Sequence, residues 1–253
     1  MDTGAITQYV DVAQLVLYAF WIFFAGLIYY LLRENHREGY PMAPGRENGP
    51  KTDGWPAVPK PKIYKLANGH EVLSPDHSRA DGDYNGQPAH GWIGAPLEPV
   101  GNPLLAGVGP GAWAKRADVP DMTYEGEAKI VPLRVAGDHG VAVQDTDPRG
   151  LPVIGADGEQ AGTVRDLWVD KSEMMFRYLE VGLPSGATVL LPMTFSVIKR
   201  HGVFVDALLA GQFTLVPTTR HPEQITMLEE ERITAYYGAG TLYATPQRQE
   251  PLL

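Results

Sequence analysis

One apolar run near the N-terminus constrains this chain more than any other feature. From Val12 to Leu32 it reads VAQLVLYAFWIFFAGLIYYLL, in which Gln14 is the only strongly polar side chain. About 20 such residues in a helix cross the hydrocarbon core of a bilayer. A signal peptide is the rival interpretation, but signal peptides begin with a basic region and have a shorter apolar core. Here the preceding residues include Asp2 and Asp11 and no Lys or Arg. The run predicts one retained transmembrane helix over 12–32, preceded by a short segment, 1–11.

The charges that follow the run predict its direction. Arg33, Arg37, Arg46 and Lys51 come soon after the last apolar residue. Loops rich in Lys and Arg stay on the cytoplasmic side of a membrane. We therefore expect a periplasmic N-terminus and a large cytoplasmic C-terminal part.

Composition excludes several classes of protein. The 253 residues contain no Cys, so disulfides, zinc–thiolate sites, iron–sulfur ligation and cysteine nucleophiles are absent. The net charge of −9 argues against a nucleic-acid partner, which needs clustered Lys and Arg. The seven His do not occur at metal-ligand spacing, and they are interpreted as surface or turn residues. G-x-S-x-G, a P-loop and a dinucleotide fingerprint are also missing, so we expect no enzyme that acts alone.

The segment 33–111 is dense in Pro and Gly. Two short strand-like runs, Ile63 to Leu66 and His70 to Leu73, flank Asn68-Gly69 as in a hairpin. Disordered linkers are poor in aromatic residues, yet this segment contains Trp55 and Trp92. We therefore expect an extended cytoplasmic segment that is ordered by packing on partners.

The remainder, 112–253, predicts a mainly β cytoplasmic domain. From Lys129 onward, short apolar runs alternate with turn residues such as Pro184-Ser185-Gly186 and His201-Gly202. This spacing predicts a small antiparallel sheet or barrel of about six strands. Thr226 and Glu229 have the spacing of a capping box, which begins one short C-terminal helix that Gly238 can end.

A charged cluster interrupts the β pattern in RDLWVDKSEMMFRYLE. On a strand Asp166 and Asp170 share one face, and Arg177 returns beside them if Lys171 to Met175 form the connection. Neighbouring carboxylates raise one another's pKa while Arg opposes that rise, so such a cluster could pass protons. From the residues alone, a solvated hairpin with surface ion pairs is the favoured interpretation. The charged members are Arg165, Asp166, Asp170, Lys171, Glu173, Arg177 and Glu180.

Several segments resemble a known family. They are YAFWIFFAGLIYY, REGYP, GNPLLAGVGPGAW, DPRGLPV, AGTVRDLWVDKSE, RYLEV, LLPM and LEEERITAYYGAGTLYATP. In this order they are similar to the H subunit of purple bacterial photosynthetic reaction centres, and the β part resembles the PRC-barrel domain. The likeness runs from end to end and is weakest between Ala43 and Pro96.

The resemblance implies an accessory subunit that binds no cofactor alone. It would cap the cytoplasmic face of the L and M subunits, which hold bacteriochlorophylls, bacteriopheophytins, quinones and a non-haem iron. It would stabilise the secondary quinone site and help conduct protons there. The location implied is the bacterial inner, intracytoplasmic photosynthetic membrane, beside a light-harvesting antenna ring. The alternative is a membrane-tethered β-domain binding module with no electron-transfer role.

The resemblance also implies site residues. In the family, an acid matching Glu173 transfers protons, with an acid matching Asp170 and a base matching Arg177 nearby. Some relatives take up protons at an Asp and two His that bind Zn or Cd. The corresponding stretch here contains Glu125 and Glu127 and no His. We therefore expect these two carboxylates to collect protons without a metal site.

Four residues at the end of the apolar run form the predicted lipid interface. They are Tyr30, Arg33, Arg37 and Tyr40. The resemblance implies contact with an anionic lipid such as cardiolipin, whereas snorkelling and simple anchoring at the headgroups explain the same residues equally well.

Overall fold

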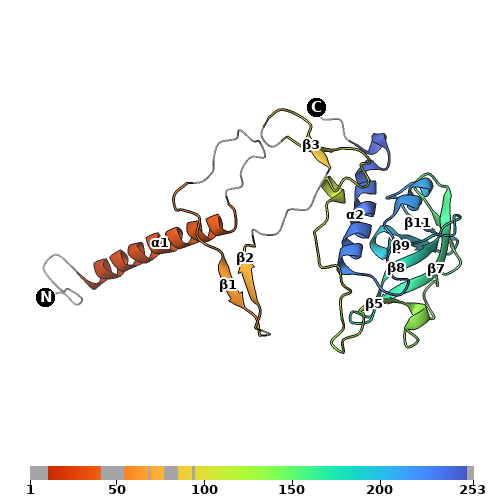
Figure 1. The fold of residues 1–253 in the computed structure, drawn as a ribbon, viewed down its shortest axis with the longest axis horizontal. Helices are drawn as coiled ribbons and strands as arrows, with labels where there is room; N and C mark the ends of the chain where they lie inside the picture. The colour runs from red at the N-terminus through yellow and green to blue at the C-terminus, as the bar shows by residue number, and fades with distance from the viewer. Residues whose placement is uncertain (1–10, 41–53, 68, 77–84, 93–94, 250–253) are drawn as a thin grey trace. The chain divides into compact units, whose positions relative to one another are not determined.

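The computed structural model describes residues 11–40, 54–67, 69–76, 85–92 and 95–249. The chain divides into two compact units. The first combines Met1–Asp81 with Gly91–Ala95, and the second combines Gly82–His90 with Pro96–Leu253. Figure 1 traces the elements of each unit.

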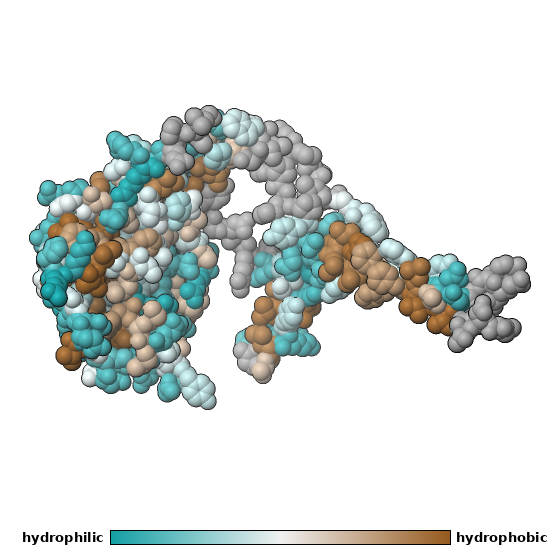
Figure 2. Space-filling model, turned by 180° about the vertical axis from the view of Figure 1, so that it is seen from behind, coloured by the Kyte–Doolittle hydropathy of each residue, from teal (hydrophilic) through white to brown (hydrophobic). Residues whose placement is uncertain are grey.

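Helix α1, Val12–Arg37, dominates the first unit. It begins with a capping box, because the Asp11 carboxylate accepts a hydrogen bond from the Gln14 N–H (2.8 Å) and the Gln14 side chain accepts one from the Asp11 N–H. The apolar side chains of the helix are exposed, and Figure 2 shows hydrophobic surface along it. Among the described residues this one helix is long and apolar enough to cross a membrane. The helix that the run over 12–32 predicts is therefore present.

The predicted hairpin is also present in the first unit. Strands β1 (Lys62–Lys65) and β2 (Glu71–Ser74) pair antiparallel, with Ile63 opposite Leu73. Both strands are largely exposed, and an isolated two-stranded hairpin is only marginally stable in water.

The second unit is built on a seven-stranded sheet. Its order is β10-β11-β6-β7-β8-β9, and β5 pairs with β7 off this path. The long strands β7 and β8 form its centre. The strands are β5 (Ile130–Pro132), β6 (Pro152–Ile154), β7 (Gln160–Asp170), β8 (Met175–Gly182), β9 (Thr188–Pro192), β10 (Val197–Lys199) and β11 (Gly202–Phe204). A separate pair comprises β3 (Gly86–Pro88) and β4 (Leu97–Pro99).

The topology differs in two respects from a small antiparallel barrel. Strand β11 runs parallel to β6, with Val203 opposite Val153. The sheet is open, since no pairing joins β9 to β10 within the described part of the chain. The predicted mainly β domain with one short C-terminal helix is confirmed, and its barrel is not closed.

The core lies between the sheet and helix α2, Met227–Tyr243, which runs beside it (Figure 1). Ile233, Tyr236 and Tyr237 on the helix are fully buried, as is Leu179 on β8. Residues 104–111, which the sequence assigned to the extended segment, also pack in this unit and end in the 3-10 helix η1 (Gly109–Gly111) against α2.

The start of α2 was predicted correctly and its end was not. The capping box of Thr226 and Glu229 is formed, with the Glu229 N–H donating to Thr226 Oγ1 (3.1 Å). The prediction that Gly238 ends the helix was wrong, because the helix continues to Tyr243. A Cβ at Gly238 would overlap the carbonyl oxygen of Pro110. This glycine therefore permits close contact with the preceding segment and does not cap the helix.

Candidate functional site

Asp170, at the end of β7, organises the turn that carries the predicted acids. Its side chain is 0% exposed, and its Oδ1 accepts hydrogen bonds from the backbone N–H groups of Ser172 and Glu173, each at 3.0 Å. Short polar side chains stabilise turns in this way. The turn holds Glu173 beside Asp170 and leaves the Glu173 side chain half exposed.

The other oxygen of Asp170 faces two cations. The Arg177 Nε and the Lys129 Nζ each lie 3.5 Å from Asp170 Oδ2. This buried oxygen accepts no hydrogen bond from the described residues. Asp170 is thus a buried carboxylate that is compensated by charge and still has acceptor capacity for a water or a proton.

A bulge between β7 and β8 accounts for the position of Arg177. Trp168 pairs with Tyr178 and Val169 pairs with Phe176, so Arg177 is the extra residue on β8. A bulge redirects a side chain while the strands on either side stay paired. The prediction that Arg177 returns beside Asp170 is confirmed.

Lys129 is a member of this cluster that sequence reasoning missed. Its Nζ lies 3.5 Å from Glu173 Oε1 and 3.6 Å from Asp121 Oδ2, in addition to its contact with Asp170. Burial favours the neutral amine, but the charges of Asp170, Glu173 and Asp121 outweigh it and raise the pKa of Lys129. Ile130 on β5 pairs with Asp170 on β7, and this pairing brings the neighbouring Lys129 to Asp170. In the sequence, the one indication of this pairing is that Lys129 comes directly before an apolar run.

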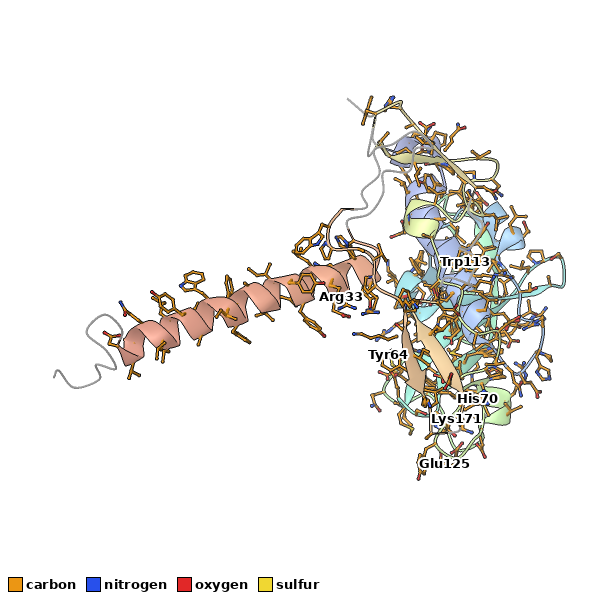
Figure 3. The ribbon with its side chains drawn as sticks, turned by 60° about the vertical axis from the view of Figure 1, so that its left-hand side comes forward. Arg33, Tyr64, His70, Trp113, Glu125 and Lys171 are labelled. Carbon is orange, nitrogen blue, oxygen red and sulfur yellow. The ribbon has the colours of Figure 1, made fainter. Side chains whose placement is uncertain are left out.

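Lys171 links the same turn to the predicted point of proton uptake. Its ammonium forms an ion pair with the Glu127 carboxylate. Residues 122–128 form a tight turn in which Gly126 has a φ of +82°, and Glu125 lies exposed at its tip (Figure 3). The structure therefore brings Glu127 to the turn that bears Glu173, while Glu125 points to solvent.

Asp166 and Glu180 do not join this cluster. Arg134 Nη1 donates to Asp166 Oδ2 (3.2 Å) and to Glu180 Oε2 (2.7 Å), and Trp168 Nε1 also donates to Glu180 (2.9 Å). The charged run predicted as one cluster is thus two clusters, and the second joins β7, β8 and the 3-10 helix η2 (Leu133–Val135).

His139 combines a contact to a carboxylate with a buried ring nitrogen. Its Nδ1 lies 2.8 Å from Asp138 Oδ1, and its buried Nε2 has no hydrogen-bond partner among the described residues. The hydrogen bond from His139, with a smaller effect from Lys171, lowers the pKa of Asp138. Within the described ranges, no three His, Asp or Glu side chains are grouped to hold a metal ion.

Comparison with family models decides the identity of the chain. Residues 4–135 match the model for the N-terminal region of the photosynthetic reaction centre H-chain, and residues 141–210 match the PRC-barrel domain. The chain belongs to the reaction-centre H-chain family. It is therefore an accessory subunit of a photosynthetic reaction centre, associated with L and M subunits in a complex that contains pigments and quinones. This membership favours the reaction-centre interpretation over a tethered module.

The first unit of this H-chain shows how the end of α1 is held. Arg37 is buried, with its Nε 3.1 Å from Glu34 Oε2 and its Nη1 donating to the carbonyl of Lys60. Lys62 Nζ lies 2.6 Å from the same Glu34 oxygen. The ring of Trp55 also lies beside that of Tyr29, with 5.4 Å between centroids. The segment before β1 is therefore fastened to the last turns of the helix.

The four predicted lipid-interface residues differ in accessibility. Tyr30, Arg33 and Tyr40 are exposed, and Figure 3 shows Arg33 near the C-terminal end of α1. Arg37 is engaged with Glu34 and the backbone of Lys60. Arg37 thus has an internal role, and the exposed three are the better candidates for contact with lipid.

Proposed function

We propose that this H-chain caps the cytoplasmic face of the L and M subunits, stabilises the site of the secondary quinone and helps conduct protons to it. The observation that carries the proposal is the buried Asp170 between Lys129 and Arg177, next to the half-exposed Glu173. Reducing a quinone to a quinol takes two electrons and two protons. A site covered by protein needs titratable groups that lead inward from water.

The acids of this region become more buried from the turn at 122–128 to the turn that follows β7. Glu125 is exposed, Glu127 pairs with Lys171, Glu173 is half exposed and Asp170 is fully buried. The proposal assigns proton collection to Glu125 and Glu127 and proton transfer to Glu173 and Asp170. Lys129 and Arg177 lower the cost of a negative charge in the buried part.

The first experiment tests membership of the complex: the near-infrared absorption of what copurifies with a tagged chain should show bacteriochlorophyll bands that bleach on illumination.

The second experiment tests proton transfer by replacing Glu173 with Gln in the intact complex. We then expect slowing of light-driven proton uptake by about tenfold or more, since a positioned acid or base typically contributes about 10²–10⁴-fold. Glu159→Gln is the control, because Glu159 is exposed on the same domain, in the turn before β7. Equal rates in both variants would refute the role of Glu173.

The proposed orientation places the N-terminus in the periplasm and the sheet domain in the cytoplasm. The absence of native cysteine makes Ser185→Cys, in the exposed turn between β8 and β9, a unique label site. A membrane-impermeant maleimide should label it in inside-out vesicles and not in intact cells. The reverse pattern would contradict the orientation.

We also propose that Tyr30, Arg33 and Tyr40 contact anionic lipid and that an antenna ring surrounds the complex. The exposure of the three side chains, two in the last turns of α1 and one just after it, supports the first point. Replacing Arg33 by Gln should reduce the cardiolipin that copurifies with the complex, as measured by mass spectrometry of extracted lipids. Unchanged lipid content would leave simple anchoring as the role of Arg33.

A further inference from the structure

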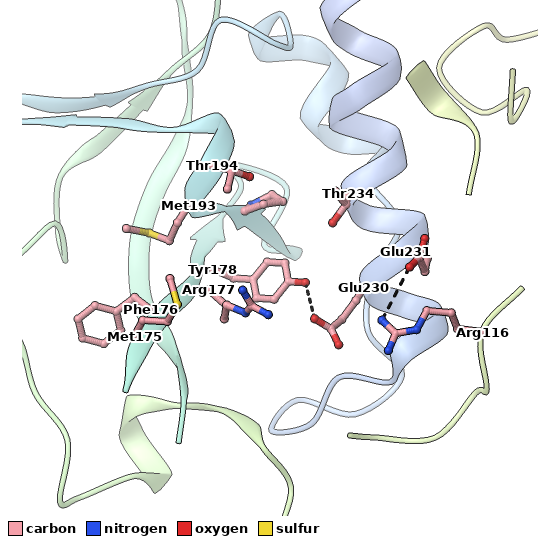
Figure 4. Close-up of a pocket in the computed structure, with 11 residues that line it drawn as sticks. Arg116, Met175, Phe176, Arg177, Tyr178, Met193, Thr194, Glu230, Glu231 and Thr234 are labelled. Carbon is pink, nitrogen blue, oxygen red and sulfur yellow. Dashed lines mark hydrogen bonds and ion pairs between the residues drawn. The ribbon is translucent and has the colours of Figure 1, made fainter. Parts of the chain in front are cut away.

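A cavity of about 300 Å³ lies where β8 faces the first turns of α2. Figure 4 shows Arg177 and Tyr178 at the cavity on β8, Glu230 and Thr234 on α2, and Arg116 on the segment between η1 and β5. Its volume is sufficient for several water molecules, and its wall includes enough polar groups to bind them. The function proposed above does not use this cavity.

Glu230 and Glu231 are the acids in its wall. The Tyr178 hydroxyl donates a hydrogen bond to Glu230 Oε2 at 3.0 Å, and Tyr178 is buried. Arg116, the cation on the helix side, lies 3.7 Å from the neighbouring Glu231. Glu230 therefore has a hydroxyl partner within hydrogen-bonding distance, while its cationic neighbours pair with other acids.

Groups on β8 and on the segment before β5 act on the carboxyl of Glu230. Burial raises the pKa of its carboxyl above the usual range, and Asp121 acts in the same direction. The hydrogen bond from Tyr178 and the charges of Arg177 and Arg116 oppose this rise. The net effect favours the protonated acid more than at an exposed glutamate.

Arg177 contacts both this cavity and the cluster of Asp170, Glu173 and Lys129, called the acid cluster below. Its Nε lies 3.5 Å from Asp170, and its side chain also lines the cavity beside Glu230. An arginine remains charged in proteins, so it cannot relay a proton itself. It can, however, stabilise negative charge on the acids that flank it, while water in the cavity carries the proton.

A simpler role for Glu230 is to tie α2 to β8 through Tyr178. A glutamine would serve that role almost as well, because its amide oxygen also accepts a hydrogen bond from a hydroxyl. A structural tie needs only the contact between Glu230 and Tyr178. It gives no reason for Glu230 to line a polar cavity, nor for Arg177 to reach both that cavity and the buried Asp170. The two roles therefore predict different results for Glu230→Gln.

We propose that Glu230 is a further proton-holding acid of this complex, hydrated by the cavity and coupled to Asp170 through the shared Arg177. This inference rests on the proposed proton-conducting function. The Glu230 O–H releases its proton through cavity water toward the quinone and becomes a carboxylate, and a proton from bulk water restores it. The light-driven complex supplies the electrons, so no residue of this chain is oxidised or reduced.

The test uses light-minus-dark infrared difference spectra of the intact complex in H2O and D2O. We expect a C=O band of a protonated carboxylic acid that shifts in D2O, is lost in Glu230→Gln and persists in Glu231→Gln. Tyr178→Phe keeps the ring and should shift the band, because it removes the hydrogen bond to the acid. An identical band in all variants would overturn the proposal.

Rates of proton uptake distinguish this inference from the function on which it rests. We expect Glu230→Gln to slow uptake by about tenfold, a smaller effect than the roughly hundredfold that a single obligatory acid can contribute. If Glu173→Gln slows uptake and Glu230→Gln does not, the inference fails and the proposed function stands. If neither variant slows uptake, both fail.

Discussion

Replacing Lys129 by Met should loosen the turn that holds Glu173. The change keeps an unbranched side chain one atom shorter than lysine and removes one of the two cations that face the buried Asp170. Removing one partner of a buried ion pair typically costs about 3–5 kcal/mol, because a charge is left uncompensated. Arg177 remains 3.5 Å away and Lys129 is partly exposed, so we expect about 2 kcal/mol, below that range.

Hydrogen exchange in the intact complex measures this effect locally. The amides of Ser172 and Glu173 donate to Asp170, so their exchange reports how often the turn opens. A loss of about 2 kcal/mol corresponds to exchange that is about 30-fold faster, at 1.4 kcal/mol for each factor of ten. Mass spectrometry of peptides that cover the turn gives the rate.

A second substitution tests whether the charge on Asp170 causes the effect. In Asp170→Asn the buried charge is absent, so adding Lys129→Met should cost much less than it does in the unchanged chain. If Lys129→Met alone leaves exchange unaltered, Lys129 does not stabilise the turn. If it accelerates exchange equally in both backgrounds, its effect comes from the lost contacts of its side chain and the electrostatic argument is refuted.

Three further predictions concern other parts of the chain. Gly238→Ala should cost about 1–3 kcal/mol through overpacking, measured by urea unfolding in detergent, whereas Gly137→Ala, where a Cβ meets no neighbour within 4 Å, should cost little. Because burial raises the pKa of the Glu230 carboxyl, the free energy of unfolding should fall as pH rises from about 4.5 through the pKa of the folded state. Glu230→Gln should remove that fall, and profiles of unfolding free energy against pH that run parallel in the two proteins would contradict this. With Glu125 and Glu127 in place of imidazole ligands, micromolar Zn should inhibit proton uptake only weakly, and strong inhibition would refute uptake by carboxylates alone.

The acid cluster shows how far local sequence patterns extend. The spacing of Asp170 and Arg177 predicted their approach, since a short turn returns one strand beside the other. The same spacing wrongly grouped Asp166 with them, because a period of two gives the face of a strand and not the partner that binds there. Arg134, which binds Asp166, comes from a segment distant in sequence.

Local sequence patterns were enough to predict the elements whose causes are local. These are the apolar length of α1, the hairpin around Gly69, the turns of the sheet and the capping box that begins α2. Tertiary structure decided what depends on distant partners. Strand pairing placed Lys129 beside Asp170, and the approach of Pro110 made Gly238 a contact point within a continuing helix. The reason is physical: propensity and spacing act over a few residues, whereas burial and ion pairing depend on which segments the fold brings together.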